Sequence, residues 1–473
     1  MPIRIHPIRP LFCAALIALL LALQSLAGPS YQIDLDVDWD AGTFAGTSQV
    51  TFSNDGAQPL NEVVFRLFAN DEGIYGGASI RVASASSGST ELDLSDPSDP
   101  TVLSAILPTP LAPGQTTSLT LRFEGAAGRS IAGIPGQTSG YGILTRNTNS
   151  FVLTSFYPIL AVRDDAGWQT SSTCGVGDAL WGEAGDYSVA VSAPPGVVPA
   201  GTGTLVRSDV QTDSTVHRFS VESARDFALV LLRGFDEAEL QSGSHTFRTW
   251  FTPSERGAAE RTLLVASGAT DVYERRIGPL QFDEVELVGV PLARAAGIEF
   301  SGLILLAASY AQRAFEPFYD ILVSHEMAHQ WFYAAVGTDP AVHPWLDEGP
   351  ATYLSNLYLE ESGRTAQAES EVRRWQDVYR RAKGLYPHLT IAEPTCGYPR
   401  SDAYADFAYE GAAWFLHSIR GVIGDDAFFE GLSTYYDAAA GEIATPEDLL
   451  SAFERAAGRD LDSLYEAFGL RSE

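Results

Sequence analysis

The sequence has 473 residues, of which 45% are hydrophobic and 11% aromatic. This length and composition predict a globular protein of two or three domains. Sixty acidic side chains against thirty basic ones give a formal net charge of −30. That charge argues against nucleic acid or an anionic membrane as a partner, because their phosphates would repel the protein.

Residues 1–27 have the pattern of a secretory signal peptide. Arg4 and Arg9 precede an apolar run from Leu11 to Leu23, and Ala27 ends a stretch of small residues suited to cleavage. We expect cleavage after Ala27, export to the periplasm or the extracellular space, and no stable membrane insertion afterwards. An uncleaved anchor is the alternative, but the run is shorter than the roughly 20 residues that span a bilayer.

Cleavage would remove Cys13 and leave two cysteines, Cys174 and Cys396. Disulfides persist in exported proteins. A bridge between the two and a pair of separate buried thiols both remain open, because the positions of cysteines in a sequence do not fix their pairing.

The first half of the chain has the pattern of β-structure. Residues 31–39, 117–125 and 186–194 alternate between apolar and polar residues, as strands with one buried face do. Clusters of Gly, Pro, Asn and Asp separate such stretches. We therefore expect residues 28–247 to form a β-sandwich or saddle domain.

The pattern changes near Arg256, after which helical periodicity dominates. We expect helices within residues 259–278, 315–337, 350–363, 366–384, 408–424 and 445–458, and one strand at residues 283–291. The predicted fold class is α+β, with the N-terminal β domain followed by a mostly α-helical domain over residues 248–473.

One stretch contains two candidate metal ligands. Residues 322–332 read LVSHEMAHQWF and place His325 and His329 four positions apart. Pro317 suits the first turn of a helix and Gly337 its end, so we expect residues 322–332 to lie inside one helix. Residues four apart share a helix face, and both imidazoles can therefore bind one metal ion.

A third ligand is expected at Glu348, at the start of the next predicted helix. Two imidazoles and one carboxylate leave one position of Zn²⁺ for water, as catalytic zinc sites do. Zinc lowers the pKa of that water, and Glu326 can take its proton as general base. His343 is an alternative third ligand, although it precedes Pro344 in a connecting turn. We expect one Zn²⁺ per chain.

These motifs resemble a known family. HEMAHQWF followed by WLDEG resembles the gluzincin aminopeptidases, of which aminopeptidase N is the best-known member. Residues 296–302, AGIEFSG, resemble the exopeptidase motif of that family, and residues 409–436 resemble the segment with its catalytic tyrosine. Residues 31–55 resemble the opening of its β domain. The resemblance implies a thermolysin-like zinc peptidase domain after the β domain, in the short bacterial form of the family.

The resemblance also implies roles for individual residues. It implies zinc ligation by His325, His329 and Glu348 and general-base catalysis by Glu326. It implies that Glu299 binds the free α-amino group of the substrate, with Gly297 in the same substrate-binding segment. Tyr409 falls where a phenol donates a hydrogen bond to the oxyanion, an interaction that can contribute a few kcal/mol.

The sequence departs from the family pattern in several places. Ile298 and Phe300 replace the usual residues of the exopeptidase motif, so its specificity is not carried over. Ser355 stands where a carboxylate often supports a zinc-bound histidine, and such groups change metal affinity or activity 10- to 100-fold. No counterpart of the β domain's amine-binding acid or amide is evident. The chain also lacks room for the helical-repeat domain of longer members, which predicts a more open cleft.

We expect an exported zinc aminopeptidase that removes N-terminal residues from peptides or proteins. A thermolysin-like endopeptidase with the same zinc site is one alternative. A non-catalytic zinc-containing binding protein is another, motivated by Ser355 and Ile298. The sequence gives neither the preferred first residue nor the oligomeric state.

Overall fold

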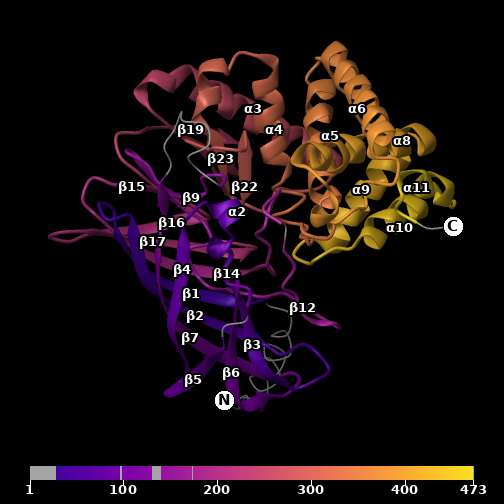
Figure 1. Ribbon diagram of the computed structural model, residues 1–473. Helices are drawn as coiled ribbons and strands as arrows, with labels where there is room; N and C mark the ends of the chain where they lie inside the picture. The colour runs from indigo at the N-terminus through magenta and orange to yellow at the C-terminus, as the bar shows by residue number, and fades with distance from the viewer. Residues whose placement is uncertain (1–27, 96–97, 130–139, 173, 472–473) are drawn as a thin grey trace, which may run out of the picture.

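The computed structural model describes residues 28–95, 98–129, 140–172 and 174–471. The chain runs from β-sheets in its first half to helices in its second, as the α+β prediction requires (Figure 1). Figure 1 shows the indigo and magenta sheets below and to the side of the orange and yellow helices. The expected signal peptide, residues 1–27, lies outside the described residues.

An eleven-stranded sheet forms the body of the N-terminal part. Its strands are β1 (Ser30–Asp38), β2 (Thr43–Ser53), β3 (Leu60–Arg66), β4 (Ser79–Ser87), β5 (Thr90–Ser95), β6 (Val102–Leu111), β7 (Thr116–Ala126), β11 (Ile159–Leu160), β14 (Gly185–Ala193), β16 (Thr204–Val210) and β17 (Thr215–Ala224). They lie in the order β11-β3-β6-β5-β4-β7-β2-β1-β14-β17-β16. β1, β7 and β14 confirm the three strands predicted from alternation, and in β1 every second side chain is buried.

Smaller elements complete this part. A second sheet has the order β15-β18-β10-β9-β8 and a hairpin pairs β12 with β13. Their bounds are β8 (Gly128–Arg129), β9 (Leu144–Arg146), β10 (Ser150–Leu153), β12 (Arg163–Asp164), β13 (Gly167–Trp168), β15 (Val198–Gly201) and β18 (Leu229–Leu232), with the short helices η1 (Phe68–Asn70) and α2 (Glu72–Tyr75). Aromatic rings contact one another in the core of this part; those of Tyr31 and Tyr187 stack 4.6 Å apart.

A five-stranded sheet supports the helical part. Its strands are β19 (Asp236–Ser242), β20 (His245–Phe251), β21 (Glu284–Val290), β22 (Gly297–Phe300) and β23 (Leu303–Ala307), in the order β19-β20-β21-β23-β22. The sequence predicted β21 alone, because β23 is short and buried on both faces and therefore does not alternate. The expected division at residues 247/248 falls inside β20, which pairs with β21. Strand pairing therefore favours a division before β19.

Each predicted helical stretch contains a helix. The bounds are α3 (Arg256–Arg276), α4 (Pro317–Ala328), α5 (Trp345–Glu361), α6 (Thr365–Leu385), α7 (Ser401–Tyr404), α8 (Ala412–Ile423), α9 (Asp425–Ala439), α10 (Pro446–Ala457) and α11 (Asp462–Phe468), with η2 (Pro253–Glu255), η3 (Ala308–Arg313), η4 (Thr395–Gly397) and the π-helix η5 (Ala405–Gly411). Among the described residues, no helix combines the length and the apolar character needed to cross a membrane.

The helix with the histidine motif ends earlier than expected. α4 stops at Ala328, and His329 is its C-cap with helical backbone angles of φ −64° and ψ −14°. Tyr333 then turns the chain with a φ of 137°. The prediction that residues 322–332 lie inside one helix is therefore wrong. His329 still keeps its helical spacing from His325, because the C-cap residue retains helical angles.

Helix α5 begins before the helical stretch expected at residues 350–363. Glu348 lies in its first turn, as predicted, but the helix begins at Trp345 and places Pro350 in its interior. A proline there removes one backbone hydrogen bond. The helix continues to Glu361 because α3, α4, α6 and α8 pack around it.

One buried arginine joins the two parts of the molecule. Arg225 follows β17 and is 1% exposed. Its guanidinium donates to the carbonyls of Tyr333 (2.8 Å), Ala335 (2.6 Å), Gly182 (3.3 Å) and Glu442 (2.5 Å). The β domain thereby holds the turn after α4 in place.

Candidate metal and active site

A cavity of about 370 Å³ lies between β22, α4, α5 and η5. It is lined by all seven residues that the sequence singled out: Gly297, Glu299, His325, Glu326, His329, Glu348 and Tyr409. They come from four separate elements, so the tertiary fold brings them together.

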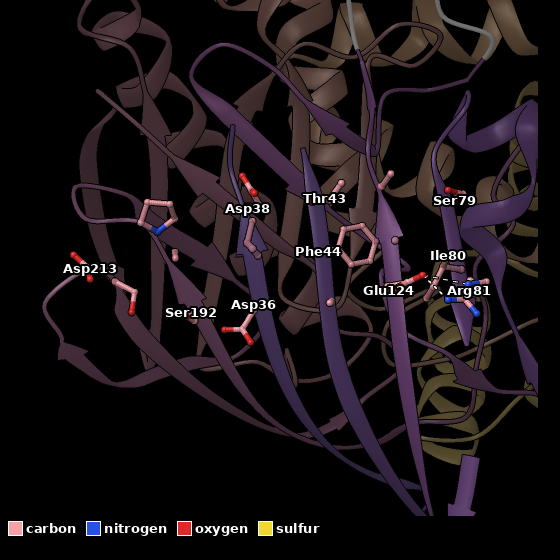
Figure 2. Close-up of a pocket in the computed structure, with 17 residues that line it drawn as sticks. Asp36, Asp38, Thr43, Phe44, Ser79, Ile80, Arg81, Glu124, Ser192 and Asp213 are labelled. Atoms are coloured by element: carbon pink, nitrogen blue, oxygen red, sulfur yellow. Dashed lines mark hydrogen bonds and ion pairs between the residues drawn. The ribbon is translucent and has the colours of Figure 1, made fainter. Parts of the chain in front are cut away.

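A larger cavity of about 950 Å³ lies on the β domain and contains none of these residues. Figure 2 shows Asp36 and Asp38 of β1 on one side of it, and the ion pair of Arg81 with Glu124 on the other. Within the described part of the chain, its acids form no group with the spacing of metal ligands. The chemistry predicted from the sequence therefore belongs to the smaller cavity.

The three predicted ligands, His325, His329 and Glu348, form what we call the metal trio. The two Nε2 atoms lie 3.2 Å apart. A carboxylate oxygen of Glu348 lies 3.2 Å from Nε2 of His325 and 3.6 Å from Nε2 of His329. This is the donor set of a catalytic zinc site with one open position.

Asp347 fixes the tautomer of His329. Nδ1 of His329 lies 2.6 Å from Oδ1 of Asp347 and 3.1 Å from the carbonyl oxygen of Phe332. Because both partners are acceptors, Nδ1 carries the proton, and the lone pair of Nε2 faces the centre of the trio. The supporting carboxylate is therefore present, but not at the position examined in the sequence. Ser355 instead donates to the carbonyl of Thr352.

The site also has the electrostatics of a cation site. Oε2 of Glu326 and Oε2 of Glu348 are buried, and neither has a hydrogen-bond partner among the described residues. Burial raises the pKa of Glu299 and of Glu326, and the nearby Glu348 carboxylate raises both further. Since buried carboxylates are costly unless paired or bound to metal, the residues present fit Zn²⁺.

Two other ligand sets fit less well. Glu299, Glu326 and His329 also have ligand atoms within 4.8 Å of one another. That set holds two carboxylates and one imidazole, and it would use the expected base as a ligand. His343, the alternative third ligand, belongs to no such group in the described ranges. The metal trio is therefore the favoured set.

Glu326 lies against the backbone of β22. A Cβ atom on Gly297 would come within 2.4 Å of Oε1 of Glu326. Any larger residue at position 297 would therefore displace this carboxylate. Gly297 has a clear packing role beside the expected general base, and its contact with substrate stays a prediction.

Glu299 lies on the same wall, with Oε2 4.0 Å from Nε2 of His329. Gln330, just after the histidine motif, fixes the end of β22. Its side-chain amide accepts from the N–H of Gly302 (2.9 Å) and donates to the carbonyl of Phe300 (3.1 Å). The Glu299 carboxylate is thus held beside the metal trio, where it can attract a cationic group of a substrate.

Tyr409 comes from the π-helix η5. Its ring stacks on that of His325, with centroids 5.9 Å apart and planes 11° apart. Burial, and then the charge of Glu348, raise the pKa of Tyr409 well above its ordinary value. The phenol therefore keeps its proton and can donate a hydrogen bond into the cavity. Short π-helical segments often occur at functional sites.

The fold brings two further acids to the cavity that sequence reasoning missed, Asp178 and Glu410. Asp178 lines this cavity, and it lines a smaller neighbouring one together with Glu299. Burial raises its pKa, and the charges of Glu299 and Glu348 raise it further. Asp178 lies in an irregular loop between β13 and β14, far from the histidine motif in sequence, so no local pattern marks it.

Comparison with known families adds independent evidence. A model of the Peptidase family M1 domain matches residues 273–468. Residues 273–468 are therefore similar to the M1 peptidases, over less than half of the chain. The match runs from α3 to α11 and includes β22, α4, α5 and η5. It confirms the resemblance to the gluzincin aminopeptidases, and the matched range contains all seven predicted site residues that line the cavity.

Curated proteins similar to this chain include several that are named aminopeptidases. Human aminopeptidase RNPEPL1 is 27% identical over 280 residues, which are 56% of this chain and 37% of the relative. Probable aminopeptidase 2 of Sulfurisphaera tokodaii is 23% identical over 244 residues, 49% of this chain and 31% of the relative. The chain therefore spans well under half the length of these relatives.

Solved structures show the same two-part fold. A crystal structure of an M1 zinc metallopeptidase from Deinococcus radiodurans has a TM-score of 0.65 and 19% identity, covering 94% of each chain. A structure of a mutant of that enzyme with a Tyr-Ser-Ala substrate has a TM-score of 0.63, 19% identity, and coverage of 94% of this chain and 95% of that one. The likeness confirms the predicted fold class, a β domain followed by a mostly α-helical domain.

Proposed function

We propose that this protein is an exported, zinc-dependent aminopeptidase that removes N-terminal amino acids from peptides. The observation that carries the proposal is the position of the buried Glu299 carboxylate, 4.0 Å from Nε2 of His329 in the metal trio. A fixed anion so close to the metal would bind the α-ammonium group of a peptide. It would thereby place the first peptide bond at the metal.

The metal and three residues of the cavity each have a defined role in this proposal. A bound Zn²⁺ would supply an acidified water and a Lewis acid for the carbonyl. Glu326 takes the proton of the attacking water and passes it to the leaving amine. Tyr409 donates a hydrogen bond to the oxygen that gains negative charge. Glu299 orients the substrate, which converts binding energy into correct alignment of the bond.

The similar proteins, the N-terminal sequence and the net charge also support the proposed function. The curated relatives are named aminopeptidases, and the Deinococcus enzyme was solved with a tripeptide substrate. Residues 1–27 have the composition of a signal peptide, which is the basis for proposing export. A peptide substrate also agrees with the net charge of −30, because that charge disfavours nucleic acid.

The first test is hydrolysis of a panel of aminoacyl fluorogenic amides by residues 28–473, each with a free amine or an acetylated one. We expect turnover of free-amine substrates alone, and its loss when zinc is chelated, because Glu299 binds an ammonium and the water needs the metal. Rates and zinc content are measured together.

Two results would contradict the proposal. Equal turnover of acetylated peptides would indicate an endopeptidase with the same metal site. Zinc-loaded protein without turnover of any peptide would indicate a binding protein.

The supporting carboxylate of the metal trio gives a separate prediction. Asp347→Asn should weaken zinc binding about 10- to 100-fold, because an amide no longer fixes the proton on Nδ1 of His329. Zinc affinity is measured by competition with a chromogenic chelator. Asp36→Asn, in the groove of the β domain, is the matched control and should leave affinity unchanged. Unaltered zinc affinity in Asp347→Asn would show that His329 is not a ligand oriented by this carboxylate.

A further inference from the structure

The cavity that holds the metal trio has an apolar end. Phe318, Ile321 and Leu322 of α4 line it together with His325. Residues three, four and seven positions apart share one face of a helix, so these side chains lie along the same side of α4. Phe318 is 45% exposed although it is large and apolar. An accessible ring on the same helix face as a metal ligand is placed to contact a bound substrate.

The packing of α4 against α5 shows the direction in which this end lies. The two helices lie side by side (Figure 1). His325, near the end of α4, lies 3.2 Å from Glu348 in the first turn of α5. Asp320, near the start of α4, pairs with Arg364 just after the end of α5. The helices are therefore antiparallel, and the apolar end of the cavity lies toward the start of α4 and the end of α5.

Glu299 lies at the opposite end of α4. Its carboxylate is 4.0 Å from Nε2 of His329, the C-cap residue of that helix. A peptide with its α-ammonium group at Glu299 and its first carbonyl at the metal must place its second residue on the far side of the metal trio. That side is the apolar end. Each helical turn adds about 5.4 Å, so only a large side chain reaches Phe318, two turns before His325.

The wall that faces the apolar end is formed by small side chains. Thr352 and Ser355 of α5 line the cavity, and the hydroxyl of Ser355 donates to the carbonyl of Thr352 (2.8 Å). Arg374 of α6 also lines the cavity, but its guanidinium donates to the carboxylates of Glu371 (2.8 Å) and Glu410. Small side chains and a paired arginine leave room opposite the apolar residues for a bulky side chain.

The ring of Phe318 is supported from outside the cavity. Tyr310 of η3 contacts it, with ring centroids 5.4 Å apart and planes 43° apart. Because Phe318 remains partly exposed, this contact holds the ring without covering it. A second aromatic ring can therefore pack against Phe318 from the cavity.

We propose that Phe318 is a specificity-determining residue that receives a large apolar side chain, above all an aromatic one, from the second residue of the peptide substrate. The proposal rests on the proposed aminopeptidase function and extends it to the leaving side of the scissile bond. A large side chain against Phe318, Ile321 and Leu322 removes apolar surface from water, and two aromatic rings gain further from edge-on or offset packing. Alanine in second place is too short for these contacts.

The test is a set of tripeptides that share the best first residue and a C-terminal alanine. Their second residue is alanine, leucine, phenylalanine, lysine or aspartate. In the wild type, kcat/KM should be about tenfold higher with phenylalanine than with alanine, and in Phe318→Ala this ratio should fall to about twofold. Phe318→Leu should keep most of the preference for leucine, because the wall stays apolar. Each value is a ratio on one protein, so a general loss of activity cancels.

Phe315→Ala is the matched control for Phe318→Ala. Phe315 is 82% exposed, lies outside the lining of the cavity, and has its ring beside Gly257 of α3. Its replacement removes an exposed phenylalanine three positions away and should leave the ratio at the wild-type value.

Calorimetry gives a second readout that does not depend on turnover. The zinc-loaded Glu326→Gln variant should bind the same tripeptides without cleaving them. Their dissociation constants should show a preference for phenylalanine over alanine of about tenfold, reduced to about twofold when Phe318→Ala is added.

The outcomes separate this inference from the proposed function. Equal kcat/KM and equal affinity for the phenylalanine and alanine peptides would overturn it. A preference for lysine or aspartate, or a ratio that Phe318→Ala leaves unchanged, would overturn it as well. If the wild type hydrolyses none of the peptides, the proposed function fails, whereas calorimetry still decides whether Phe318 selects the second residue.

Discussion

Replacing Glu326 with glutamine should lower kcat by about 10³-fold while the protein retains zinc. The amide keeps the size of the side chain but cannot take a proton from water, and general-base catalysis typically contributes 10²- to 10⁴-fold. Zinc should remain because the metal trio supplies its ligands without Glu326. Steady-state kinetics and zinc content per chain are the two measurements.

Glu316→Gln is the matched control for this prediction, because that carboxylate is exposed at the N-cap of the same helix, α4. It should change neither kcat nor zinc content. Full activity of Glu326→Gln would mean that another group removes the proton. Loss of zinc in that variant would favour the other ligand set, Glu299, Glu326 and His329, over the metal trio.

Replacing Arg225 with methionine should destabilise the protein by several kcal/mol. The guanidinium donates to four backbone carbonyls at the junction of the two parts. Leaving a buried acceptor unsatisfied costs about 1–3 kcal/mol each. Urea unfolding followed by fluorescence would measure the change in the free energy of unfolding. Activity should fall as well, because Arg225 holds Tyr333 in the turn after α4.

Arg207→Met, at an exposed arginine of β16, is the control and should change stability by less than about 0.5 kcal/mol. Arg225→Lys should be nearly as harmful as Arg225→Met, since one ammonium cannot reproduce the fork of a guanidinium. If Arg225→Met has the same urea midpoint of unfolding as the wild type, the junction does not depend on these hydrogen bonds.

Local patterns in the sequence predicted much of this fold. Alternation identified β1, β7 and β14, because the signal depends on one buried face of a single element. Helical periodicity identified the longer helices except α9, which lies in none of the predicted helical stretches. The same local rules failed for β22 and β23, which are short, and for the end of α4. That end is decided by Tyr333, whose carbonyl and hydroxyl are bound by Arg225 and Asp226 of the β domain.

In the candidate site, too, local spacing predicted some residues and the three-dimensional structure supplied another. His325, Glu326 and His329 could be predicted because their spacing on one helix already places them on one face. Glu348 could be predicted because a short connection brings the next helix back. The carboxylate that orients His329 was sought at Ser355 and is supplied by Asp347. Side-chain direction in α5, rather than the spacing alone, decides which acid reaches the imidazole.

The sequence by itself predicted the three candidate metal ligands and the candidate general base, and it determined the order of β domain and helical domain. These depend on residue type and on contacts between near neighbours in the chain. Only the tertiary structure decided that Asp178 lines the same cavity as Glu299, that Cys174 bonds to Cys396, and that Arg225 holds the turn after α4. Each of those contacts joins segments distant in sequence, and their approach is set by the packing of the whole core rather than by any local pattern.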